Sequence, residues 1–338
     1  LRAAYLSHVF ESVGHLSLAG IDPKAAGERA EARLNLGAVY TALLTLTPEE
    51  HEAETPMMSP QRRERESRRL SALAQLDRHD RLVLLGDPGS GKSTFVNFVA
   101  LCMAGALLKQ AAADTPADTS AGTSEADTLA ALPDLTRLTE PLPSDKEKDD
   151  EEPQPQPWSH GALLPVRVVL RDFAARGLPP PGEPATAKHL WTFIAAELDQ
   201  AALGEYANSL GRTLLKKGGL LLLDGLDEVP EAQHRREQIK QAVTDFAGTF
   251  KRCRILVTSR TYAYQQQAWR LPGFAEAVLA PFGEGQIRRF VDRWYAHIAP
   301  LRGIHPDDAE GRAALLKRAI FGSDRLHELA ERPLLLTL

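Results

Sequence analysis

The chain has 338 residues and a formal net charge of -5, and 43% of its residues are hydrophobic. This length allows one large domain or two to three ordinary ones, and the mildly acidic charge gives no electrostatic case for nucleic acid as the main partner. Two cysteines, Cys102 and Cys253, are too few for a disulfide framework, which favours a reducing cytoplasm. The longest apolar stretch, residues 95–108, contains Asn97 and is too short to span a bilayer.

The first part of the chain contains alternating helical and extended patterns. Residues 1–17 have the apolar spacing of a helix, whereas residues 34–47 are rich in small, aromatic and β-branched residues and predict a strand or extended segment. A charged segment with late leucines, residues 59–77, predicts a second helix. Residues 81–86 form a short apolar strand pattern that ends in glycine, and residues 92–109 predict a buried helix.

Strand and helix patterns alternate again in the middle of the chain. Apolar strand patterns cover residues 162–174, 218–230 and 253–260, and helical patterns cover residues 185–200 and 231–250. Nearly continuous apolar strands that alternate with helices are typical of a doubly wound, mostly parallel α/β sheet.

Composition suggests where domains begin and end. Residues 110–156 are rich in Ala, Thr, Asp and Pro, which predicts a disordered surface insertion. Only helical patterns follow Phe282. We therefore predict an N-terminal flanking region (1–58), a nucleotide-binding domain (59–282) and a small helical domain (283–338). Both ends look cut, so we expect effector and sensor domains outside this chain.

A glycine-rich stretch follows the strand pattern at residues 81–86. It matches G-x-x-x-x-G-K-[ST], the P-loop pattern, in which glycines let backbone N–H groups surround a phosphate at a helix N-terminus. We expect Lys92 to reach the β- and γ-phosphates, Ser93 to be a Mg²⁺ ligand and Thr94 to contact the α-phosphate. The predicted nucleotide-binding residues are Gly86, Asp87, Pro88, Gly89, Ser90, Gly91, Lys92, Ser93 and Thr94.

Two further strand ends supply the polar groups that nucleotide chemistry needs. Asp224 ends the apolar run LLLLD, and ligands of parallel sheets bind outside the carboxyl ends of strands, so Asp224 is a predicted Mg²⁺ ligand. Asp227 and Glu228 follow it and are predicted to orient or deprotonate a water. Arg260 ends the strand RILVTS and is predicted to contact the γ-phosphate.

The motifs GDPGSGKST, LLLLDGLDEV and ILVTSR, in this order, resemble the NACHT family of STAND signal-transduction NTPases, which includes the NLR proteins. The resemblance implies a sheet with strand order 5-1-4-3-2, in which the Arg260 strand lies between the P-loop strand and the Asp224 strand. It also implies that Pro333 packs near the adenine of ATP or ADP, although Arg332 stands where the family often has Asn or Gly. A winged-helix region, which normally follows in the family, would lie beyond residue 338.

The resemblance implies an ATP-driven switch that self-associates when activated. From charge and apolar length, we predict no direct nucleic-acid or membrane binding. Gly225 directly follows Asp224 where motor ATPases carry a glutamate, so we expect weak ATPase activity with slow turnover. The Ala-, Arg- and Leu-rich composition suggests a high-GC bacterium and antiphage or immune defence as a setting.

Three alternative functions stay open at this point. They are a remodelling or transport ATPase with continuous turnover, a GTPase or small-molecule kinase, and a scaffold that binds nucleotide without relevant hydrolysis. The chain has no LSGGQ-like stretch, which argues against the transport ATPases, and no N-K-x-D motif, which argues against guanine.

Overall fold

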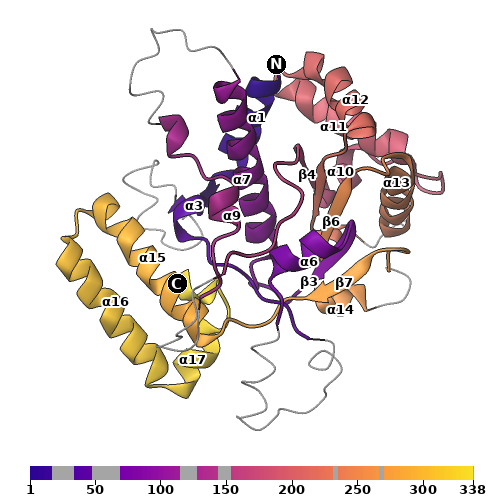
Figure 1. Ribbon diagram of the computed structural model, residues 1–338. Coiled ribbons are helices and arrows are strands. Elements are labelled where there is room, and N and C mark those ends of the chain that lie inside the picture. Colours follow the sequence, from indigo (N-terminus) through magenta and orange to yellow (C-terminus); the bar gives the residue numbers. More distant parts are fainter. Residues whose placement is uncertain are drawn as a thin grey trace.

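The computed structural model describes residues 1–16, 34–47, 69–114, 128–143, 154–230, 235–265 and 270–337. Within these residues, a five-stranded parallel sheet in the order β4-β5-β6-β3-β7 forms the centre (Figure 1). Its strands are β3 (Arg81–Leu85), β4 (Pro165–Val169), β5 (Leu220–Asp224), β6 (Arg254–Ser259) and β7 (Ala275–Val278). Numbered along the chain this is the order 5-1-4-3-2, so the predicted sheet is confirmed. The place of β7 in the chain was not predicted from the sequence.

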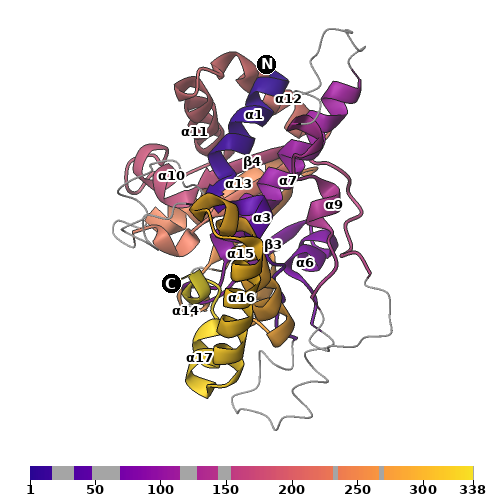
Figure 2. The same cartoon turned by 90° about the vertical axis from the view of Figure 1, so that its left-hand side faces the viewer.

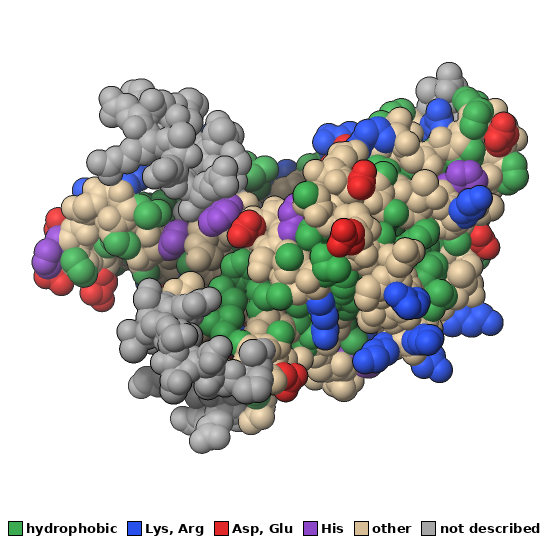
Figure 3. Space-filling model, turned by 90° about the horizontal axis from the view of Figure 1, so that it is seen from above, with side chains coloured by type: hydrophobic (Ala, Val, Ile, Leu, Met, Phe, Trp, Pro, Cys, Tyr) green, Lys and Arg blue, Asp and Glu red, His purple; other side chains and the backbone are tan. Residues whose placement is uncertain are grey.

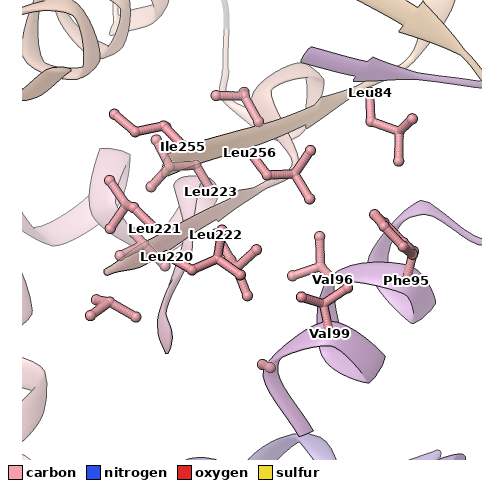
Figure 4. Close-up of a cluster of buried hydrophobic side chains, with 14 of the residues drawn as sticks. Leu84, Phe95, Val96, Val99, Leu220, Leu221, Leu222, Leu223, Ile255 and Leu256 are labelled. Atoms are coloured by element: carbon pink, nitrogen blue, oxygen red, sulfur yellow. The ribbon is translucent and has the colours of Figure 1, made fainter. Parts of the chain in front are cut away.

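Helix α7 (Lys92–Ala113) packs against one face of the sheet. Alternate side chains of a strand point to opposite faces, and Leu82, Leu256 and Leu222 are in register on three adjacent strands. Figure 4 shows Leu84, Leu222 and Leu256 on the side of Phe95, Val96 and Val99 of α7. All six are buried. This contact fixes the start of α7 close to the carboxyl ends of the strands.

By length and composition, α7 would pass as a membrane span. It has 22 residues, more than the sequence suggested, because the helix continues to Ala113. However, 67% of its most apolar window is buried, against the sheet and against α1 (Arg2–Val13). In this structure α7 is therefore the core helix of the α/β unit.

Further helices surround this core (Figures 1 and 2). Figure 1 shows α10 (Leu170–Arg176) and α13 (Arg235–Thr249) on the side of the sheet away from α7. The C-terminal helices α15 (Glu284–Arg302), α16 (Pro306–Phe321) and α17 (Asp324–Ala330) lie together at the lower left of that view. Two 3-10 turns, at Gly204–Tyr206 and Leu226–Glu228, interrupt the α/β part. The remaining helices are α6 (Ala72–Arg78), α11 (Ala187–Gln200), α12 (Ala207–Lys216) and α14 (Thr261–Tyr264).

The segment at residues 34–47 differs from the predicted strand. Only β2 (Leu34–Asn35) is a strand there, paired with β1 (His15–Leu16), and the helical turn α3 (Leu36–Val39) follows. The Asn35 side chain caps α3 by accepting the Gly37 N–H at 2.9 Å. This local cap explains why a segment with strand-like composition begins a helix. After α3 the chain is extended, with isolated bridges at residues 44 and 45.

Part of the predicted insertion has a defined structure. Residues 128–143 contain α9 (Leu135–Leu138), and Leu138 is buried against the core. The prediction of disorder for residues 110–156 is therefore wrong for this part, because Leu138 supplies apolar surface that the composition average hides. Residues 115–127 and 144–153, and the first part of the predicted helix 59–77, lie outside the described residues.

Charges of both signs are spread over the face of the molecule shown in Figure 3. Lys and Arg side chains gather at the right-hand end of that view, on the side of the molecule that holds α11, α12 and α13 in Figure 1.

Candidate functional site

The P-loop joins β3 to α7 at the carboxyl edge of the sheet. Gly89 and Gly91 have φ angles of 78° and 93°, a left-handed conformation that side-chain-bearing residues rarely adopt. Gly91 is the N-cap of α7, so the loop turns directly into the helix N-terminus. A Cβ at Gly86 would lie 2.6 Å from Ser90 Oγ. A glycine-rich loop that turns into a helix N-terminus in this way suits a phosphate group.

Lys92 folds back over this loop. Its Nζ donates to Gly86 O at 2.5 Å and to Asp87 O at 3.0 Å. Burial lowers the pKa of the Lys92 amine below its ordinary value, and the Asp227 carboxylate opposes this shift. A nearby anion stabilises the charged form of an ammonium group that is partly desolvated and held only by neutral carbonyls. The loop therefore suits a polyphosphate.

Asp224 lies next to the P-loop, as predicted from its place at the end of β5. Ser93 Oγ donates to Asp224 Oδ1 at 3.0 Å, and Thr258 Oγ1 donates to the same oxygen at 2.6 Å. Arg167, from β4, has a nitrogen 3.8 Å from Asp224 Oδ2. A hydroxyl and a carboxylate at this spacing are the protein ligands that suit Mg²⁺ beside a bound triphosphate, so Ser93 and Asp224 fit the metal that the fold implies.

Asp227 and Glu228 lie close together, on the 3-10 turn after β5, but in different surroundings. The Asp227 side chain is 7% exposed, and it accepts Arg260 Nε at 2.9 Å and the Arg260 backbone N–H at 2.9 Å. The Glu228 side chain is 45% exposed, with Arg171 3.8 Å away. Asp227 therefore holds Arg260, and Glu228 is the carboxylate with access to water.

The cavity beside the P-loop has a volume of about 660 Å³. One end is polar, and the other is an apolar wall from the 34–47 segment and the helical domain. Thr41 lies in this wall, 3% exposed, and among the described residues its Oγ1 has no hydrogen-bond partner. The lining comprises Val39, Tyr40, Thr41, Leu43, Pro88, Gly89, Ser90, Gly91, Lys92, Ser93, Thr94, Asp224, Gly225, Asp227, Glu228, Thr258, Arg260, Phe282, Phe290, Pro333 and Leu334.

The structure brings most of the predicted site residues into this one cavity. Pro333, named only from the family resemblance, is among them, and the Leu334 N–H next to it donates to Gly89 O at 3.3 Å. Gly86 and Asp87 are not in the lining, but their carbonyl groups hold Lys92. The roles of these residues stay predictions.

Several residues of the site were not predicted from the sequence. Thr258, Arg167, Tyr40 and Thr41 reach it from elements whose distance in sequence gives no sign of contact. A hydroxyl near the carboxyl end of β6, beside the strand of Asp224, was the one available signal for Thr258.

Comparison with known proteins agrees with this geometry. A family model described as the NACHT domain matches residues 80–297, which is more than half of the chain. A search among curated proteins found no match. The matched range contains the P-loop, Asp224 and Arg260 together with the sheet that places them side by side. The chain therefore belongs to the NACHT family of nucleotide-binding, signalling-type P-loop NTPases.

Proposed function

We propose that this protein is an ATP-driven molecular switch with slow hydrolysis. One observation carries the proposal: the same cavity is lined by the P-loop, by Arg260 at the predicted γ-phosphate end, and by Phe290 and Pro333 of the helical domain. A nucleotide that fills this cavity touches both domains, so a change at the γ-phosphate can alter how they pack.

The residues divide the work of binding between two ends of the cavity. Lys92 exchanges its loop carbonyls for the β- and γ-phosphate oxygens, and the N–H groups at the start of α7 bind the β-phosphate. Ser93 and Asp224 would hold Mg²⁺, which supplies positive charge to the phosphates when bound. The apolar wall receives the base, and the Thr41 hydroxyl, which has no hydrogen-bond partner in the described part of the chain, offers it one hydrogen bond. The nucleotides that this arrangement suits are ATP and ADP.

Hydrolysis would depend on Glu228 and Arg260. Glu228 orients a water and takes its proton while the water oxygen attacks the γ-phosphorus, and the bond to the bridging oxygen breaks to leave ADP and phosphate. Arg260 leaves Asp227 to contact the γ-phosphate. No carboxylate directly follows Asp224: Gly225 is there, with φ at 82°, and its N–H donates to Thr258 Oγ1 at 2.9 Å. The base must act from a surface turn, which suits slow turnover.

When the protein switches to its ATP-bound state, it would self-associate in the cytoplasm. The two cysteines are buried, and burial raises the pKa of the Cys253 thiol to about 11, so both fit a reducing compartment as unreactive core residues. The proposed partners are further copies of this protein. Innate-immune or antiphage signalling is the proposed setting, by analogy with the family alone.

Hydrolysis and assembly can be measured on the same sample. We expect light scattering after gel filtration to give a larger species with ATP and Mg²⁺ than with ADP, and turnover below the typical enzyme range of ~1–10³ per second. Motor-like turnover with an unchanged molar mass would support a remodelling ATPase instead. Equal behaviour with ATP and ADP would support a scaffold, and a preference for GTP would exclude the adenine assignment.

A further inference from the structure

The ordered part of the predicted insertion is fastened to the nucleotide-binding part of the molecule. Asp134 caps α9 by accepting the Thr136 N–H at 2.9 Å, and it forms an ion pair with Lys109 of α7 at 2.6 Å. On the other side, Gln156 Nε2 donates to Glu140 O at 2.7 Å. Figures 1 and 2 show α9 beside α7. Residues 128–143 are thus held at a fixed place on the α/β core.

From this place, Arg137 of α9 holds the pocket wall. Its Nε donates to Gly37 O at 2.9 Å, and its Nη2 donates to Tyr40 O at 2.9 Å. Its guanidinium lies 5.3 Å from the ring centroid of Phe98, on which the Tyr40 ring stacks at 3.7 Å. Tyr40 lines the cavity, so Arg137 fixes both the backbone and the ring of a wall residue without touching the cavity itself.

The helical domain reaches the same point. Arg293 of α15 donates from Nη1 to Tyr40 O at 2.5 Å, so two arginines converge on one carbonyl. Glu140 lies between them, with Oε2 accepting from Arg137 and Oε1 accepting from Arg293. Arg289 adds a hydrogen bond from Nη1 to Pro141 O at 2.5 Å. We name Arg137, Glu140, Arg289 and Arg293 the arginine–glutamate clasp.

The charge balance of the clasp makes Glu140 its decisive member. Arg137 and Arg293 share the Glu140 carboxylate, and its negative charge also acts on nearby Arg289. Burial, and next the positive charge of Arg293, lower the pKa of both Arg137 and Arg289. Without the carboxylate, two half-buried guanidiniums would face each other across the Tyr40 carbonyl, and a like-charge contact separates its partners.

We propose that Glu140 and Arg137 are positioning residues of the nucleotide pocket, which lock α15 of the helical domain onto the pocket wall at Tyr40 and so slow nucleotide exchange. The proposal rests on the proposed function, because it concerns the regulation of that same site. The insertion thereby controls how readily the two domains separate around a bound nucleotide.

Release of a fluorescent ADP, mant-ADP, from the full chain tests the clasp. For Glu140→Gln we expect release about fivefold faster or more, the lower bound of typical coupling between sites. Arg293→Gln should give a similar rate and also covers the case that Glu140→Gln does not fold. The variant that carries both Glu140→Gln and Arg293→Gln should release mant-ADP no faster than the faster of the two single variants. The reason is that each single variant already breaks the same Glu140–Arg293 interaction. Asp292→Asn is the matched control: Asp292 neighbours Arg293 on α15 but pairs with Lys317 of α16 at 2.5 Å.

Hydrogen exchange separates a positioning role from a general loss of stability. In Glu140→Gln, amide exchange should rise in residues 36–43 and stay unchanged in β5 and α13. The proposal is overturned if Glu140→Gln releases mant-ADP at the rate of Asp292→Asn, or if exchange rises equally throughout. If the unmodified protein binds no mant-ADP, the proposed function fails, whereas the exchange experiment without nucleotide still decides whether the clasp holds the wall.

Discussion

Asp227 and Arg260 are joined twice, since the carboxylate accepts both the side-chain Nε and the backbone N–H of Arg260, each at 2.9 Å. The Asp227 side chain is only 7% exposed, whereas that of Glu228 is 45% exposed. We therefore propose different tasks for the two neighbouring acids: Asp227 holds the Arg260 side chain until nucleotide binds, and Glu228 contacts the water.

This division predicts different defects for the two acids. Glu228→Gln should lower the hydrolysis rate by roughly 10²-fold or more, the usual contribution of a general base, with ATP affinity within about twofold of the original. Asp227→Asn should weaken the hold on Arg260 and reduce the difference between ATP and ADP affinity. Single-turnover hydrolysis and equilibrium nucleotide binding measure both effects. The division would be wrong if Asp227→Asn alone abolished hydrolysis while Glu228→Gln left it unchanged.

Thr258 links the Asp224 carboxylate to the backbone. Its hydroxyl donates to Asp224 Oδ1 and accepts the Gly225 N–H, and the residue is 1% exposed. Thr258→Val keeps the shape but removes the acceptor of the Gly225 N–H and one of the two hydroxyls that donate to Asp224 Oδ1. The loss should lower the free energy of unfolding by about 1–3 kcal/mol.

Thr244 of α13 provides the control for this measurement by urea denaturation. Its Oγ1 is buried and has no hydrogen-bond partner among the described residues, so Thr244→Val should be neutral or stabilising. Equal destabilisation by both variants would show that the Thr258 hydroxyl has no special role.

Arg167 places a fixed positive charge beside the predicted metal ligand Asp224. Its side chain lies 3.8 Å from the carboxylate, and its buried Nε has no hydrogen-bond partner among the described residues. Since this charge repels Mg²⁺, Arg167→Gln should lower the Mg²⁺ concentration needed for half-maximal ATP binding, on the order of threefold to tenfold. Arg212→Gln, at an exposed site on α12, is the control. A higher Mg²⁺ requirement in Arg167→Gln would instead make Arg167 a phosphate-binding residue.

His297 of α15 should make the stability of the folded protein depend on pH. Burial lowers its pKa below the ordinary value of 6.5, and its Nε2 accepts the Asn35 N–H at 3.2 Å, which requires the neutral ring. The unfolded chain therefore binds a proton at a higher pH than the folded one. Stability from this group is fully present above about pH 6.5 and is lost as the pH falls towards the folded pKa.

Chemical denaturation at pH 7.5 and pH 5.5 checks this effect. His297→Gln keeps an acceptor for the Asn35 N–H and should lose less stability on acidification than the original protein. The same substitution at exposed His8 should leave the pH dependence as it was. If His297→Gln loses as much stability on acidification as the original protein, the pH dependence arises elsewhere.

The P-loop end of the cavity could be predicted from the sequence because its determinants are local. A P-loop needs a strand, permissive glycines and a helix within a few residues, and all of these stand together at residues 81–109. Asp224 and Arg260 were predictable from one further rule, that the carboxyl ends of parallel strands meet at one edge. The sheet order came from the family resemblance rather than from the strands themselves.

The base end and the clasp depend on contacts that no local pattern shows. Tyr40 meets Phe98 and Arg293 across large separations in sequence, and the 34–47 segment has a strand-like composition that the Asn35 cap overrides. Glu140 stands in a segment whose average composition indicates disorder, yet its carboxylate joins Arg137 of α9 to Arg293 of α15. The average composition of a segment does not show the contacts of a single residue. The contacts of Glu140 become evident only in the folded structure.

The most direct test is the equilibrium binding of ADP to the nucleotide-free protein and to Lys92→Ala, measured by calorimetry. We expect one ADP to bind per chain, and GDP to bind more weakly. Lys92→Ala should remove hydrogen bonds from a charged group, worth ~1.5–3 kcal/mol, and so weaken binding roughly tenfold to a hundredfold while the fold stays intact by circular dichroism. Unchanged affinity in Lys92→Ala, or no ADP binding by the original protein, would contradict the proposed nucleotide binding.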